Sequence, residues 1–90
     1  MKRKQLRQIL DSIVLQYGNR TYNDWVSLGT DHVAESRETE FGEIQLEIQF
    51  LERSSEHVHI GFSVDDGGLW AYFPVSTSEI YERFPGSLKP

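Results

Sequence analysis

The sequence feature that most constrains the fold is a turn signal, Asp65–Gly68, between two segments of alternating apolar residues. An Asp-Gly pair in this setting is the strongest short-range indication of a β-hairpin. A two-residue turn at Asp66–Gly67 predicts the cross-strand pairs Val64 with Leu69, Phe62 with Ala71 and Ile60 with Phe73. A turn centred on Gly67–Gly68 shifts this pairing by two residues and preserves the faces. We therefore expect a hairpin of residues 57–64 and 69–73.

Residues 43–52 predict a third strand, because apolar and polar residues alternate there. One face carries Ile44, Leu46, Ile48 and Phe50, and the other carries Glu43, Gln45, Glu47 and Gln49. Residues 57–64 alternate in the same way, with Val58, Ile60, Phe62 and Val64 on one face and His57, His59, Gly61 and Ser63 on the other. Such patterns are typical of antiparallel strands with one buried face. We expect a three-stranded antiparallel meander.

Helices are predicted at both ends of the chain. Residues 2–17 have the period of an amphipathic helix, with an apolar face of Leu6, Ile9, Leu10, Ile13, Val14 and Tyr17. Ser76 and Glu79 resemble a capping box, which predicts a short final helix with Ile80, Tyr81 and Phe84 as its apolar stripe. The expected fold is a small α+β single domain, residues 1–90, in α-β-β-β-α order with the N-terminal helix packed on one face of the sheet.

Residues 19–42 leave two alternatives open. Thr21, followed by Asp24 three residues later, favours a short helical turn that contains Trp25. The same segment also fits an irregular loop over the core. Residues 35–42 are rich in glutamate and predict a mobile loop, and residues 87–90 predict a frayed tail. So long a segment without assigned structure indicates a further element in this region.

The charge distribution limits the classes of partner. The net charge is −5, and Lys2, Arg3, Lys4 and Arg7 supply four of the 9 basic residues, against 14 acidic residues in the chain. The rest of the chain is therefore strongly acidic and repels phosphate backbones, so we do not expect nucleic-acid binding. A basic protein partner fits this charge better.

Composition also limits the cellular setting. The chain has no cysteine, which excludes disulfides and thiolate metal sites and is typical of a cytoplasmic protein. No apolar segment approaches the roughly 20 residues that span a bilayer. The basic start of the chain is followed by interrupted apolar positions, so we expect no export signal.

No catalytic or cofactor-binding motif is present, so we expect neither an enzyme nor a cofactor. His57 and His59 lie two apart on a predicted strand, and that spacing can place two imidazoles on one Zn²⁺ or Ni²⁺ ion. A third ligand would have to come from Asp31, His32 or Glu47. The competing interpretation, which we favour, is two solvated histidines on the outer face of the sheet.

The strongest binding candidates are Trp70 and Tyr72, which the alternation places on the outer face. Two alternatives remain: Tyr72 covers Gly61 across the strands, or the segment Tyr22–Leu28 packs onto this face and buries both rings. The predicted binding face comprises Trp70, Tyr72, His57, His59, Glu47 and Gln49. We expect a small acidic protein-binding module; the alternatives are a homo-oligomeric accessory domain, such as a homodimer, and a metal-binding protein that uses His57 and His59.

Two resemblances bear on this expectation. The α-β-β-β-α order is also that of double-stranded-RNA-binding domains, whose second helix begins with lysines. Here the matching stretch, Ser78–Glu82, contains glutamates instead, so RNA binding does not carry over. In size, acidity and lack of catalytic groups the chain is similar to small bacterial immunity or inhibitor proteins, which implies an immunity-type or regulatory role with a protein partner.

Overall fold

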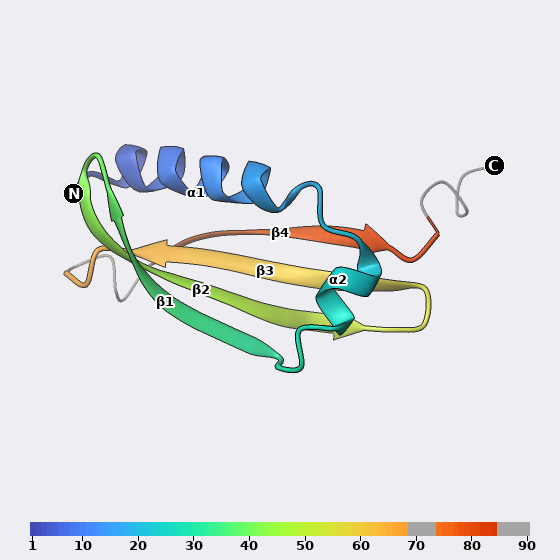
Figure 1. Cartoon of the computed structure of the whole chain (residues 1–90). Coiled ribbons are helices and arrows are strands. Elements are labelled where there is room, and N and C mark those ends of the chain that lie inside the picture. The colour runs from blue at the N-terminus through green and yellow to red at the C-terminus, as the bar shows by residue number, and fades with distance from the viewer. Residues whose placement is uncertain (69–73, 85–90) are drawn as a thin grey trace.

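The structure is a computed structural model that describes residues 1–68 and 74–84. Its elements are α1 (Arg3–Tyr17), α2 (Tyr22–Val26), β1 (His32–Thr39), β2 (Gly42–Arg53), β3 (His57–Asp65) and β4 (Val75–Glu82). The four strands form one antiparallel sheet in the order β1-β2-β3-β4. Figure 1 shows α1 running along one face of this sheet, with α2 near one of its ends. The expected antiparallel sheet and N-terminal helix are confirmed, but the sheet has four strands and not the expected three.

The helix α1 buries the apolar face that its sequence period predicts. Its buried residues are Leu6, Ile9, Leu10 and Ile13, and Val14 and Tyr17 pack against the same core. The contacts of α1 are mainly with β3 and β4, so the helix lies over one half of the sheet. The inner face of the other half of the sheet, formed by β1 and β2, is covered mainly by side chains that do not belong to α1.

The strands β2 and β3 form the centre of the sheet and confirm the predicted alternation. Their buried residues are Ile44, Leu46 and Ile48 of β2 and Val58, Ile60, Phe62 and Val64 of β3. Leu46 lies opposite Val64, and Ile48 lies opposite Phe62. The register shifts between Phe50 and Glu52, which marks a bulge at Leu51. None of the buried described residues is polar or charged.

The strand β1 replaces the mobile loop that we expected over residues 35–42. Val33 is its one partly buried apolar residue, and the next inward positions carry Glu35 and Arg37. The apolar alternation that reveals a strand is therefore almost absent here. The chain turns back at residues 40–41, and Gly42 has a φ of +117°, a conformation that favours glycine over residues with a side chain.

The strand β4 replaces the predicted C-terminal helix, so the α-β-β-β-α order, and with it the order of double-stranded-RNA-binding domains, is wrong. Val75 lies opposite Val64, and Tyr81 lies opposite Val58. A strand is favoured because it hydrogen-bonds the free edge of β3 and points Val75 and Tyr81 into the core, both of them buried. A helix would have left that edge of β3 unpaired.

The predicted partner of β3 was residues 69–73, and the pairing of Val64 with Leu69 is wrong because Val75 occupies that position. Residues 69–73 themselves lie outside the described part of the chain, as does the predicted tail of residues 87–90.

The helix α2 confirms the helical alternative for the segment after α1. The Thr21 hydroxyl accepts a hydrogen bond from the Asp24 N–H at 3.2 Å, and the Thr21 N–H donates to Asp24 Oδ2 at 2.9 Å. The Thr21 N–H and, less strongly, the Thr21 hydroxyl hold the pKa of Asp24 below its ordinary value, because their hydrogen bonds favour the ionised carboxylate. The cap directs Trp25 into the core, where it is 1% exposed. This segment therefore packs on the inner face and does not cover the outer one.

Trp25→Ala is expected to lower the free energy of unfolding by about 3–5 kcal/mol, because it removes the largest fully buried side chain among the described residues. Urea unfolding followed by circular dichroism measures the loss, and Trp25→Phe should lose less. Leu15→Ala is the control, since Leu15 is 79% exposed. A loss at Trp25 no larger than that at Leu15 would contradict this packing.

The contacts of Asp66 should make the stability of the fold depend on pH in acid. Asp66 Oδ1 accepts the Gly68 N–H at 3.0 Å, and Asp66 Oδ2 lies 3.1 Å from the Met1 ammonium group. Both contacts lower the pKa of Asp66 from its ordinary value of 3.8, the Gly68 hydrogen bond more than the ammonium. The contribution of Asp66 to stability is therefore present above about pH 4 and is lost as the pH falls through the lowered native pKa.

The test compares wild type with Asp66→Asn by urea unfolding between about pH 2 and about pH 7. The difference in the free energy of unfolding should be largest near neutral pH and should shrink in acid. A difference that stays constant across this range would show that the ionised carboxylate contributes nothing.

Candidate functional site

The sheet has an outer face that no described helix or strand covers. It is formed by alternate residues of the four strands: His32, Ala34, Ser36 and Glu38 of β1; Glu43, Gln45, Glu47, Gln49, Leu51 and Glu52 of β2; His57, His59, Gly61, Ser63 and Asp65 of β3; and Ser76, Ser78, Ile80 and Glu82 of β4. Both helices pack on the opposite, inner face. Among residues 1–68 and 74–84, the helices therefore cover the inner face of the sheet alone (Figure 1).

The outer face is acidic. Its carboxylates are Glu38, Glu43, Glu47, Glu52, Asp65 and Glu82, and its described residues include no lysine or arginine. Glu38 lies directly opposite Glu43, and like charges in that position destabilise a sheet. The face therefore attracts cations at a cost to the stability of its own strands.

All 3 histidines of the chain lie on this outer face. His32 Nε2 is 3.6 Å from Glu47 Oε2, and His57 Nε2 is 2.6 Å from Glu52 Oε1. His59 Nε2 is 2.8 Å from Ser78 Oγ. The structure thus brings together four predicted binding residues, His57, His59, Glu47 and Gln49, on one surface.

The neighbouring Ser54 is held by the hydrogen bonds of the β2–β3 turn. Its hydroxyl lies 3.3 Å from His57 Nδ1, but it also accepts the backbone N–H groups of Glu56 and His57 at 3.2 and 3.1 Å. These are the hydrogen bonds of a serine that stabilises the β2–β3 turn. Ser54 therefore has a structural role.

The predicted metal pair is not assembled into a site. His57 and His59 point to different partners, Glu52 and Ser78, and Asp31 binds Arg53 instead. Within residues 1–68 and 74–84, no group of three His, Asp or Glu side chains is placed to hold a metal ion.

A trough of about 390 Å³ lies on the outer face around Gly61. The residues that shape it are Gln49, Leu51, Gly61, Ser63, Ser76 and Ser78. Gln49 of β2 and Ser78 of β4 lie opposite Gly61. The predicted hairpin had placed Tyr72 at the position that Ser78 occupies. Two exposed apolar residues stand beside the trough: Leu51, 50% exposed, and Ile80, 60% exposed. Trp70 and Tyr72 lie outside the described residues.

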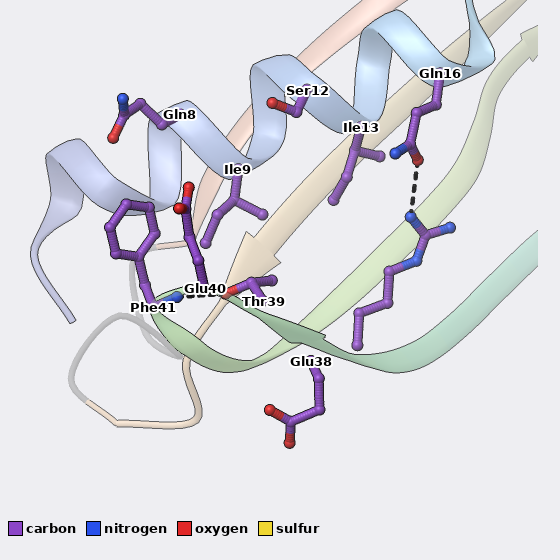
Figure 2. Close-up of a pocket in the computed structure, with 10 residues that line it drawn as sticks. Gln8, Ile9, Ser12, Ile13, Gln16, Glu38, Thr39, Glu40 and Phe41 are labelled. Carbon is purple, nitrogen blue, oxygen red and sulfur yellow. Dashed lines mark hydrogen bonds between the residues drawn. The ribbon is translucent and has the colours of Figure 1, made fainter.

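A second space, a groove of about 400 Å³, lies on the inner side between α1 and the β1–β2 hairpin. Figure 2 shows Ile9 and Ile13 pointing from α1 toward the hairpin, with Phe41 near the start of the helix. Ile9 is only 8% exposed and Ile13 only 4%. The floor of the groove therefore belongs to the core, and we assign its residues to packing.

Arg37 joins α1 to β1 at the end of this groove. Its Nε donates to Glu35 Oε1 at 2.6 Å, Nη1 to Gln16 Oε1 at 3.1 Å and Nη2 to the Tyr17 hydroxyl at 3.2 Å. The dashed line at Gln16 in Figure 2 marks the contact between Arg37 and Gln16. Because each of its nitrogens has a partner within the fold, Arg37 closes the uncovered side of the core and is not a free ligand group.

Comparison of the chain with protein-family models, with curated proteins and with solved structures finds no match. Neither described helix has the length and apolar character that a membrane-spanning helix needs.

Sequence reasoning missed the apolar part of the outer face. Leu51 follows Phe50 directly, and this break in the alternation was the signal of a bulge that turns Leu51 outward. Ile80 was assigned to the buried stripe of a helix that does not exist. Ser76 was interpreted as a helix-capping residue, yet it lines the trough together with Ser78.

Arg37→Ala is expected to lower the free energy of unfolding by about 0.5–1.5 kcal/mol, because it removes one donor shared by Gln16, Tyr17 and Glu35, which water can replace only in part. Arg37→Lys keeps the charge but supplies one donor group in place of the planar fork, so its loss should be intermediate. Urea unfolding measures both. Equal stability of all three proteins would show that Arg37 does not hold α1 to β1.

Proposed function

We propose that this protein is a small protein-binding module whose outer face docks on a basic surface of a partner protein. The observation that carries the proposal is the composition of that face: exposed Leu51 and Ile80 beside a trough, surrounded by carboxylates, with no described lysine or arginine. Protein interfaces have this arrangement, in which an apolar centre supplies binding energy and a polar rim supplies specificity.

The energetics of the face support a binding role over a structural one. The opposed pair Glu38 and Glu43 costs stability. This repulsion does not benefit the isolated fold, and it is relieved when cations approach the face, because opposite charges then replace it.

The charge of the face selects the class of partner. Two copies stacked face to face would bring carboxylates together, so the face opposes the homodimer as well as nucleic acid. The free edges also disfavour self-association, because β1 carries Glu35 and Arg37 and β4 carries Glu79 on the inner side, and inward charges prevent indiscriminate strand pairing. A basic protein remains the best fit, in an immunity-type or regulatory role. The lack of cysteine favours the cytoplasm.

The test is affinity capture from native lysate with three baits, read by mass spectrometry. The bait variant Glu43→Gln/Glu47→Gln/Glu52→Gln removes three charges from the outer face. The control variant Asp11→Asn/Glu40→Gln/Glu79→Gln removes three charges elsewhere, at exposed positions. We expect one stoichiometric partner with wild type and control, and its loss with the outer-face variant.

Stability separates binding from folding in this experiment. The outer-face variant should unfold at close to the urea concentration of wild type, because Glu43→Gln relieves the repulsion from Glu38 while Glu47→Gln and Glu52→Gln weaken the contacts with His32 and His57. A partner retained by all three baits, or no partner with any bait, would overturn the proposal.

A further inference from the structure

We infer that the trough around Gly61 is an anchor subsite that receives an arginine side chain of the partner. This inference rests on the proposed docking function of the outer face and specifies the residue that the face recognises.

The shape of the trough results from small residues on neighbouring strands. Gly61 forms its floor, with Ser78 across on β4 and Ser63 two residues further along β3. Its volume of about 390 Å³ is more than ten times the roughly 30 Å³ that one water molecule occupies in the liquid. A long side chain can therefore enter and lie along the strands.

The residues that line the trough suit both the apolar stem and the guanidinium of an arginine. Leu51 lies over Gly61 so closely that a Cβ built on Gly61 would come within 3.2 Å of the Leu51 side chain. Leu51 can therefore pack against the apolar stem of an incoming side chain. Because Gly61 has no side chain, Leu51 can lie directly over it, and a planar guanidinium would lie beside Leu51, among the serine hydroxyls of β3 and β4.

The polar groups around the trough are acceptors without a described donor. The side chains of Gln49, Ser63 and Ser76 make no hydrogen bond to any residue in the described part of the chain, whereas Ser78 is bonded to His59. Glu47 lies opposite Ser63 on the same face and supplies a carboxylate at the margin of the trough.

Several acceptors spread around one space match the five N–H donors of a guanidinium. A lysine ammonium is a compact and strongly hydrated charge with three donors, and it satisfies fewer of these groups at once. An acidic side chain would be repelled by Glu47. An aromatic ring would leave the serine hydroxyls without partners after removing them from water.

The probes are three peptides of six residues, acetylated and amidated at their ends: all arginine, all lysine and all glutamate. Each is titrated into the ¹⁵N-labelled full chain and followed by NMR. We expect the arginine peptide to shift the backbone amides of Gly61, Ser63 and Ser78 and to bind about tenfold tighter than the lysine peptide, as one additional charge-assisted hydrogen bond would give. The glutamate peptide should not bind.

Matched variants locate the preference. Ser63→Leu fills the trough without a change of charge, and Ser36→Leu makes the same substitution on β1, on the same face but away from the trough. Ser63→Leu should abolish the preference for arginine, and Ser36→Leu should retain it. Gly61→Ala is a second variant, which displaces Leu51 and should reduce the preference.

The outcomes distinguish this inference from the proposed function. Equal binding of arginine and lysine peptides, lost in Glu43→Gln/Glu47→Gln/Glu52→Gln but not in Ser63→Leu, would overturn the anchor subsite and leave the acidic docking face intact. No shift of any outer-face amide with either basic peptide would overturn both. A preference for arginine in wild type and Ser36→Leu, absent in Ser63→Leu, supports the anchor.

Discussion

The fold depends on the burial of one aromatic residue, Trp25, at the point where helices and sheet meet. Its ring lies 5.3 Å from Tyr81 of β4, 5.6 Å from Tyr17 of α1 and 6.1 Å from Phe62 of β3, between centroids. Phe50 of β2 completes the cluster at 6.3 Å. Arg20 covers the exposed side of the cluster, with its guanidinium 4.8 Å from the Tyr17 ring centroid and 5.2 Å from that of Trp25. One side chain thereby connects α1, α2 and three strands.

This cluster fixes which face of the sheet is available for binding. Because α2 is capped by Thr21 and directs Trp25 inward, both helices lie on the inner face. A chain of 90 residues has no further described element with which to cover the other side. The outer face can therefore carry charged residues, and we propose that these residues bind a basic partner. The inner face, by contrast, contains no buried polar residue among those described.

The sequence predicted the parts of the fold in which local periodicity and burial agree. α1, β2 and β3 were identified because each has one fully apolar face, and four of the six predicted binding residues were placed on one surface for the same reason. β1 and β4 were missed because the strands at the edges of the sheet bury little: β1 has Glu35 and Arg37 at inward positions, and β4 has Glu79. Their conformation is set by hydrogen bonds to β2 and β3, which no local pattern contains.

The sequence by itself determined the amphipathic helix, the two central strands and the acidity of the surface that they leave open, because each follows from the order and charge of neighbouring residues. Only the tertiary structure decided that Val75–Glu82 pairs with β3, that Trp25 packs inward, and that Leu51, Gly61 and the serines of β3 and β4 form one trough. These features join residues far apart in the chain. They arise because the free edge of β3 needs a hydrogen-bonded partner and because the core, not the local pattern, selects which face each side chain takes.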